Sequence, residues 1–268
     1  MMDRTNIVAF YKSPAPDAKD KHHVKIWDDF EGKVLGTLTF AVPIKGVRIW
    51  KHRILVVCED KSYVYNFGDL KILSRFDTCA NALGLGCLAP TLDVAVVAVL
   101  GKNQGEICID NSNKKDQNIF IQAHKANLSC LALPSDGKYV ASASETGTLI
   151  RIFNTDNGEQ VQELRRGSGQ AQIYSIAFHN TQPFLAVSSS SGTVHLFQWN
   201  RPSTMPTPVP VAAGDDDSKK AVADVNTRSV VPLPLAYFYS EWSFAKFSVP
   251  NAPKCLVNFN PDSTNEFD

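Results

Sequence analysis

Two arginines stand side by side in the stretch "ELRRGSG", at positions 165 and 166. The guanidinium group of arginine is a planar fork of N–H donors that matches the oxygens of a phosphate or carboxylate. An extended backbone sends consecutive side chains to opposite sides, so Arg165 and Arg166 would face different neighbours. Gly167 lets the chain turn away close to a ligand. The pair therefore predicts two anion sites, one on each side of this segment.

Polar residues before and after the pair supply further groups for two such sites. Upstream stand the residues that would surround Arg165, namely His124, Ser144, Thr148 and Arg151. Downstream stand those that would surround Arg166, namely Ser189, Ser191, Thr193 and His195. A guanidinium, hydroxyls and an imidazole together form the chemistry of a phosphate site. In the alternative interpretation, the hydroxyls of "SASETGT" and "SSSSGT" only satisfy the backbone of turns.

The composition argues that any anion site is local. The 268 residues include 27 Lys+Arg and 27 Asp+Glu, so the formal net charge is zero. This balance gives no reason to propose a nucleic-acid-binding protein. The first residues lack the apolar core of a secretory signal, and the longest apolar run, "VAVVAVL", is far shorter than the roughly 20 residues of a membrane span. A soluble protein with only peripheral membrane contact is expected.

Motifs of catalysis and metal binding are missing from the sequence. There is no glycine-rich phosphate loop after a strand, no HExxH and no GxSxG. The six cysteines are scattered without a CxxC pair, as expected for reduced thiols of a cytosolic protein. We expect no catalytic activity, no metal and no cofactor.

Short apolar runs bounded by turn residues predict an all-β fold that positions the arginines. Such runs include "VKIWDD", "RILVVC", "SYVYNF", "EICID", "YVASAS" and "TVHLFQW". Two longer stretches repeat each other, with Ser144 and Ser189, Gly147 and Gly192, and Thr148 and Thr193 each 45 residues apart. This spacing is near the roughly 40–45 residues of a WD40-type propeller blade. "GTLIRIF" is one residue longer than "GTVHLF", which suggests a bulge in the earlier blade.

Degenerate copies at 5–40, 44–76 and 84–110 extend the repeat towards the N-terminus. Because a blade buries its faces against its neighbours, the repeats must form a ring. The chain is thus predicted to be a single β-propeller domain over residues 1–268.

Residues 200–240 interrupt the repeat and are rich in Pro, Ala, Ser and Asp. Long loops of this kind are usually functional or disordered. The second half, "VVPLPLAYFY", is apolar and has two interpretations. It could form the next strand of the sheet, or it could be an exposed tip carrying Val230, Val231, Leu233, Leu235 and Phe238.

These features together resemble the PROPPIN family, the polyphosphoinositide-binding β-propellers called WIPI proteins in animals. The resemblance rests on "LRRG" between two WD-like blades, with "QAH" and "SASETGTLIRIF" upstream and "SSSSGTVHLF" downstream. "VKIWDD", "YVYNF" and "SEWSFAKFSVP" look like the three/four-type branch of the WIPI proteins. The match runs through nearly the whole chain.

The resemblance implies a seven-bladed propeller, of which about five to six blades' worth of sequence is present. The first blade and most of the last are expected to be missing. The family binds phosphatidylinositol 3-phosphate and phosphatidylinositol 3,5-bisphosphate at two sites, one for each motif arginine. By this analogy the first site comprises Arg165, His124, Ser144, Thr148 and Arg151, and the second comprises Arg166, Ser189, Thr193 and His195.

The resemblance also implies how such a protein would act. The loop at 200–240 lies where family members have a loop that enters the bilayer. The chain would be a monomeric adaptor in the cytoplasm that attaches peripherally to preautophagosomal, endosomal or vacuolar/lysosomal membranes. There it would recruit autophagy factors, notably a large lipid-transfer protein. The alternative is a WD-repeat scaffold that binds proteins only and has no lipid site.

Overall fold

The computed structural model describes residues 6–12, 22–89, 95–112, 117–200, 241–249 and 254–259. Over these ranges the chain forms strands β1 to β20 and no helix. The prediction of an all-β fold is therefore confirmed. No helix in the described part of the chain is long and apolar enough to cross a membrane.

The strands form five sheets that follow the order of the sequence. The first sheet contains β1 (Ile7–Lys12), β2 (His22–Asp28) and β3 (Lys33–Phe40). The second contains β4 (Ile44–Trp50), β5 (Arg53–Cys58), β6 (Lys61–Asn66) and β7 (Ile72–Asp77). The third contains β8 (Gly86–Leu88), β9 (Val96–Leu100), β10 (Glu106–Asn111) and β11 (Ile119–Gln122).

The fourth and fifth sheets are the two clear repeats of the sequence. The fourth contains β12 (Leu128–Ala132), β13 (Tyr139–Ser144), β14 (Leu149–Asn154) and β15 (Gln160–Arg165), with the short β19 (Glu241–Trp242) at its edge. The fifth contains β16 (Ile173–Phe178), β17 (Phe184–Ser189), β18 (Thr193–Gln198) and β20 (Ala245–Ser248). Neighbouring strands are antiparallel except β15 and β19, which are parallel.

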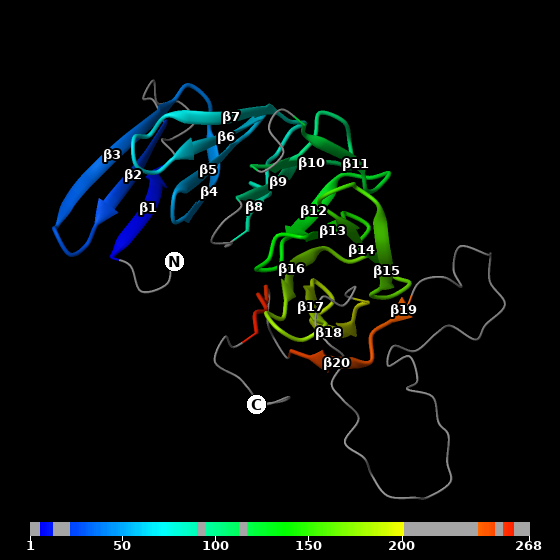
Figure 1. The fold of residues 1–268 in the computed structure, drawn as a ribbon. Helices are drawn as coiled ribbons and strands as arrows, with labels where there is room; N and C mark the ends of the chain where they lie inside the picture. Colours follow the sequence, from blue (N-terminus) through cyan, green and yellow to red (C-terminus); the bar gives the residue numbers. More distant parts are fainter. Residues whose placement is uncertain are drawn as a thin grey trace, which may run out of the picture.

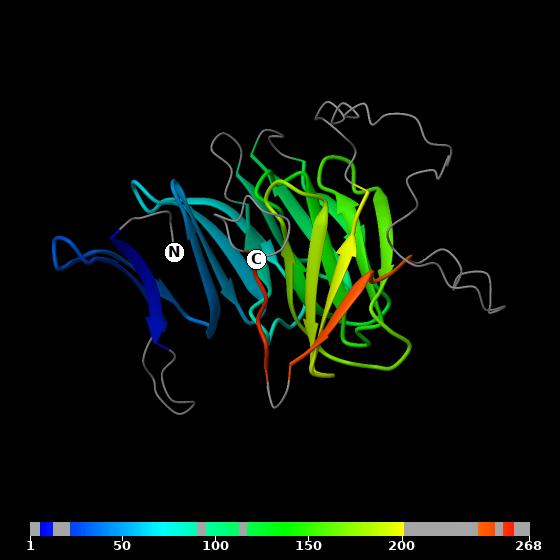
Figure 2. The same ribbon diagram turned by 90° about the horizontal axis from the view of Figure 1, so that it is seen from below.

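The sheets succeed one another along an arc, as Figures 1 and 2 show. The first strands of successive sheets, β4, β8, β12 and β16, contact one another and lie on the inner side of the arc. The same irregularity recurs near the start of the second, fourth and fifth sheets, where the register shifts at Ile44/Gly46, Leu128/Cys130 and Ile173/Ser175. The repeat read from the sequence is thus a repeat of backbone structure.

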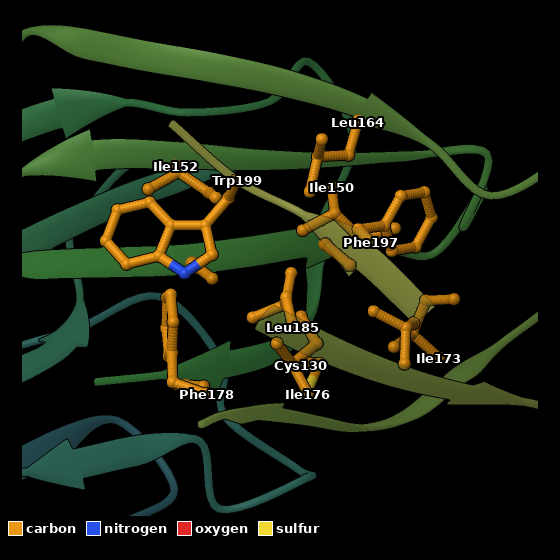
Figure 3. Packing of buried hydrophobic residues seen from close by; sticks show 14 of the residues in the cluster. Cys130, Ile150, Ile152, Leu164, Ile173, Ile176, Phe178, Leu185, Phe197 and Trp199 are labelled. Atoms are coloured by element: carbon orange, nitrogen blue, oxygen red, sulfur yellow. The ribbon is translucent and has the colours of Figure 1, made fainter. Parts of the chain in front are cut away.

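Apolar layers between sheets hold the arc together. One layer joins the fourth and fifth sheets and contains Ile150, Ile152 and Leu164 from one side and Leu185 and Phe197 from the other (Figure 3). Each of these side chains is fully buried, which contributes about 1.5–3 kcal/mol per side chain. A second layer lies between the third and fourth sheets. The fourth sheet is therefore covered on both faces.

The extra residue of "GTLIRIF" lies in a turn. The last registered pair between β13 and β14 is Ala143 with Ile150, whereas β17 and β18 remain paired up to Ser189 and Thr193. The longer segment is therefore accommodated between these strands, and no register shift occurs along β13 and β14. The sheet does contain a shift further on, between β14 and β15 at Ile152/Phe153.

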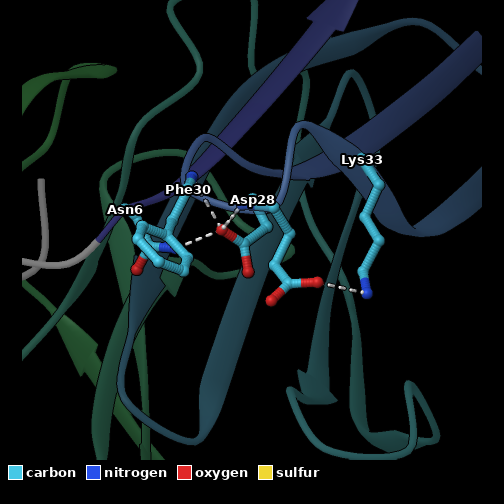
Figure 4. A network of polar contacts seen from close by, with 5 residues as sticks. Asn6, Asp28, Phe30 and Lys33 are labelled. Atoms are coloured by element: carbon cyan, nitrogen blue, oxygen red, sulfur yellow. Dashed lines mark hydrogen bonds and ion pairs between the residues drawn. The ribbon is translucent and has the colours of Figure 1, made fainter.

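The buried carboxylate of Asp28 is paired by hydrogen bonds, and the cysteine thiols are free. Asp28, the last residue of β2, caps the following turn: its Oδ1 accepts hydrogen bonds from Asn6 Nδ2 and from the backbone N–H groups of Phe30 and Glu31 (Figure 4). All six cysteines are free. Burial raises the pKa of Cys58 and Cys108 to about 12, which makes these thiols poor nucleophiles.

Candidate functional site

The end of β15 presents the two arginines to opposite sides of the fourth sheet. Leu164 packs into the layer shared with the fifth sheet. Arg165, paired with Leu149, therefore lies on the other face of the strand, towards the third sheet. The N–H of Arg166 donates to Thr148 O at 2.9 Å, which continues the pairing by one residue. The predicted divergence of the two side chains agrees with this register.

Both arginines are buried, with exposed fractions of 9% for Arg165 and 7% for Arg166. Arg166 Nε donates to Gly147 O at 2.9 Å, and its Nη2 donates to Gly169 O. Burial lowers the pKa of Arg166, but guanidinium groups stay charged in proteins. Two buried positive charges thus lie at the end of β15.

On the side of the third sheet, two of the predicted residues, His124 and Arg151, lie near each other. His124 Nε2 and Ser142 Oγ are 3.0 Å apart. Arg151 is paired with Ser142 in register, and its Nη1 donates to Ala123 O at 2.6 Å. Arg151 Nε also donates to Glu163 Oε2 at 2.9 Å. The charge of Arg151 is therefore already balanced by an internal carboxylate.

Ser144 and Thr148 lie at the turn between β13 and β14. Ser144 is buried, and its Oγ is 2.8 Å from Thr146 Oγ1. Thr148 is half-buried and accepts the hydrogen bond from Arg166 through its carbonyl oxygen. The backbone of Thr148 thus serves the second arginine, although the sequence assigns its side chain to the first.

On the side of the fifth sheet, the predicted residues form a continuous chain of hydrogen bonds. Ser189 Oγ and Ser191 Oγ are 2.8 Å apart, as are Ser191 Oγ and Thr193 Oγ1. Thr193 Oγ1 is 3.1 Å from His195 Nε2, and His195 Nδ1 is 2.9 Å from Ser243 Oγ. Ser190 Oγ accepts a hydrogen bond from the backbone N–H of Gln172, as the alternative interpretation expects. The hydroxyls of Ser189, Ser191 and Thr193 instead bond to one another. Such a chain can reorient its protons towards a bound anion.

Two histidines, one on each side, are kept neutral by burial. Burial lowers the pKa of His124 to about 4, and the nearby Arg151 adds to the shift. Burial also lowers the pKa of His195 to about 4, with further contributions from Lys246 and Arg166. A neutral imidazole can donate through one nitrogen and accept through the other, and His195 has a hydroxyl at each nitrogen.

The buried histidines should make the free energy of unfolding depend on pH between about 6.5 and 4. In this range the unfolded chain, with an ordinary histidine pKa near 6.5, takes up protons that the native state excludes. The contribution of the two histidines to stability should be constant above this window and fall on acidification within it. Urea denaturation at pH 7.5, 6 and 5 measures this, and a His124→Gln, His195→Gln variant should show a smaller decrease. Equal unfolding midpoints of the wild type at all three values would contradict it.

Several polar residues at these sites were not predicted from the sequence. Ser142 and Glu163 join the first group, and Ser243 and Lys246, which pairs with His195 in register, join the second. Alternation along "YVASAS" could have indicated Ser142, because it shares a face with Ser144. No local signal could have indicated Ser243, since it lies beyond residues 201–240.

Two further predictions concern the apolar tip of the segment 200–240 and metal binding. The apolar tip comprising Val230, Val231, Leu233, Leu235 and Phe238 lies outside the described residues. Among the residues that are described, no three His, Cys, Asp or Glu side chains are placed to hold a metal ion.

Successive sheets of three to five mainly antiparallel strands, arranged around an inner row of first strands, define the class as a β-propeller of the WD type. The chain belongs to the PROPPIN family, whose family model matches residues 17–215.

Curated relatives share this family. "Autophagy-related protein 18e" of Arabidopsis thaliana is 32% identical over 267 residues, which cover 98% of this chain and 67% of the relative. "SVP1-like protein 2" of Emericella nidulans is 33% identical over 246 residues, covering 91% and 75%. The chain thus spans about two thirds to three quarters of the length of these relatives.

Solved structures agree with the fold. "Kluyveromyces lactis Hsv2 complete loop 6CD" superposes with a TM-score of 0.67 at 24% identity, covering 96% of this chain and 72% of that one. "Complex of KlAtg21 with coiled-coil of AgAtg16" gives a TM-score of 0.62 at 25% identity, covering 74% and 65%. The first likeness supports the propeller fold. The second concerns a propeller that binds a coiled coil.

Proposed function

We propose that this protein is a non-catalytic phosphoinositide effector that binds phosphatidylinositol 3-phosphate and phosphatidylinositol 3,5-bisphosphate at two sites. The observation that carries the proposal is the pair of adjacent arginines, each at least nine-tenths buried, on opposite sides of one strand end. Burying two charges next to each other is costly unless anions or hydrogen bonds compensate them. Two phosphorylated headgroups, one on each side, would add anionic partners to the hydrogen bonds within the chain.

The site on the fifth-sheet side has groups suited to a phosphate. Arg166 supplies the charge, Lys246 contributes a second cation near His195, and Ser189 and Thr193 supply hydroxyls. On the other side, Arg165 would act with His124, Ser144 and Thr148. Arg151 would stabilise the geometry of this site through its hydrogen bonds to Glu163 and to Ala123 O.

Two sites on one rigid strand raise the affinity for a membrane beyond that of either site. After the first headgroup binds, the second event is intramolecular and proceeds at a high effective concentration. Insertion of the apolar tip at 230–238 would add about 0.8 kcal/mol for each buried CH₂ group. The protein would thus attach peripherally to preautophagosomal, endosomal or vacuolar/lysosomal membranes from the cytoplasm.

An autophagy role follows from the relatives. One curated relative is named an autophagy-related protein, and one solved neighbour binds a coiled coil of another Atg protein. We propose that the docked protein recruits autophagy factors, including a lipid-transfer protein, during autophagosome formation.

Flotation of vesicles tests the lipid proposal directly. The protein should float with phosphatidylcholine vesicles that contain phosphatidylinositol 3-phosphate, and with those that contain the 3,5-bisphosphate. It should remain at the bottom of the gradient with vesicles of phosphatidylcholine and unphosphorylated phosphatidylinositol. Equal recovery with all vesicles, or with none, would contradict the proposal.

A WD-repeat scaffold without lipid binding is the second candidate. It is favoured by the neighbour solved with a coiled-coil partner. This alternative predicts no flotation with any vesicle but capture of the same protein partner with or without lipid.

A further inference from the structure

One buried glutamine on β15 joins the two ends of the segment 201–240. Gln162 Oε1 accepts a hydrogen bond from the backbone N–H of Asn200 at 2.8 Å. Gln162 Nε2 donates to Glu241 Oε2, also at 2.8 Å. Asn200 is the last described residue before this segment and Glu241 is the first after it. The Gln162 amide thus uses its donor and its acceptor to bind the residues on either side of the segment 201–240.

The burial of Gln162 makes these two hydrogen bonds important. Its exposed fraction is 7%, and a buried amide is stable only when its polar atoms are paired. Gln162 lies on the same face of β15 as Leu164, towards the fifth sheet, because alternate residues share a face. Glu241 pairs with Leu164 in register, which brings its carboxylate next to the Gln162 amide.

Each end of the segment continues into a fixed part of the molecule. Trp199, just before Asn200, is 2% exposed and stacks edge-on against Tyr139 and Phe178. Beyond Glu241, Trp242 pairs with Arg165 in the parallel register of β15 and β19, and Ser243 bonds to His195. The returning chain therefore passes along the strand of the arginines and then enters the Arg166 side.

We infer that Gln162 is a positioning residue that couples the ends of the segment 201–240 to headgroup binding at Arg165 and Arg166. Gln162 stands three residues before Arg165 on the same strand, and it touches the chain on both sides of the segment. A shift of either end then shifts the strand that carries the arginines, and anion binding fixes both ends. Such coupling is reciprocal. The inference rests on the proposed function, since it assumes that the arginines bind a headgroup.

Exchange of the amide and the carboxylate tests this role. Gln162→Glu places a carboxylate against that of Glu241 and so removes one hydrogen bond and adds repulsion. The double variant Gln162→Glu, Glu241→Gln restores a donor–acceptor pair, and the new carboxylate at position 162 would still accept a hydrogen bond from the Asn200 N–H. Gln160→Glu is the matched control, because Gln160 is exposed on the same strand.

Two measurements on the full chain report the coupling. The first is flotation with phosphatidylcholine vesicles containing phosphatidylinositol 3-phosphate. The second is the rate of tryptic cleavage within the segment, at Lys219, Lys220 and Arg228, which needs no lipid. Gln162→Glu should bind vesicles about tenfold more weakly and be cleaved about tenfold faster, as expected for loss of a hydrogen bond to a charged group. The double variant should regain both properties, and Gln160→Glu should behave as the wild type.

The outcomes separate this inference from the proposed function. If the wild type does not float, the proposed function fails and the coupling has no basis. If the wild type floats and Gln162→Glu floats equally well, the inference alone is overturned. It is also overturned if the double variant remains as weak as Gln162→Glu while thermal unfolding shows that both are folded, because the loss then does not depend on the Gln162–Glu241 pair.

Discussion

The double variant Arg165→Thr, Arg166→Thr should lose detectable binding to vesicles that contain phosphatidylinositol 3-phosphate. A hydrogen bond to a charged group contributes about 1.5–3 kcal/mol, and about 1.4 kcal/mol corresponds to a factor of ten in affinity. Each single variant should therefore bind at least about tenfold more weakly. Because the arginines serve different sides of β15, one remaining site should still give weak, headgroup-dependent flotation. With both removed, no site remains.

A charge-matched control separates these two sites from general attraction to an anionic surface. Arg48→Thr, Arg75→Thr removes the same charge from exposed positions in the second sheet and should float as the wild type. Arg165→Lys, Arg166→Lys keeps the charge without the planar fork and should be intermediate. Flotation of the arginine double variant at the wild-type level, or an equal loss in the Arg48, Arg75 control, would contradict the two-site arrangement.

Gly147→Ala should destabilise the protein much more than Gly192→Ala. Gly147 and Gly192 occupy the same place in the two clear repeats and both have a positive φ, 60° and 68°. A Cβ at Gly147 would collide with the backbone oxygen of Ala171, but at Gly192 its nearest neighbour is Val249 O at 3.6 Å. The shared φ costs about 1–2 kcal/mol in each variant. The collision with fixed backbone should raise the loss at Gly147 to about 4 kcal/mol or more.

This pair is informative because each glycine is the control for the other. Urea denaturation should show a much lower unfolding midpoint for Gly147→Ala than for Gly192→Ala. Since Gly147 O accepts a hydrogen bond from Arg166 Nε, any folded Gly147→Ala protein should also bind vesicles more weakly. Equal midpoints for the two variants would contradict this prediction, because they would mean that the backbone at Ala171 moves away at little cost in free energy.

The sequence was sufficient to predict the strands and the blade repeat. The runs "RILVVC" and "YVASAS" coincide with β5 and with β13, because apolar residues between turn residues determine a strand locally. The divergence of Arg165 and Arg166 was predictable for the same reason, since it depends only on an extended backbone. The match of residues 17–215 to the PROPPIN family model agrees with the predicted resemblance.

The contacts of distant residues could not be predicted in this way. Ser243 reaches His195, and Glu241 reaches Gln162, only because the chain returns to the fourth sheet after residue 240. No periodicity in the sequence encodes that return. The partner of Arg151 was also not predicted: Glu163 lies opposite it on β15, and the register of β14 and β15 contains a shift that cannot be counted from the sequence.

The parallel pairing of β19 with β15 has a consequence for how the molecule bends. The backbone crosses from the fourth sheet to the fifth after β15, returns to pair as β19, and crosses again into β20. The chain therefore crosses the junction between these sheets several times. Within the described residues, the second and third sheets are connected by the chain only between β7 and β8. Bending of the arc should concentrate at such singly connected junctions. The two arginines lie at the junction that the chain crosses several times. The distance between their two sites should therefore stay constant when the arc bends.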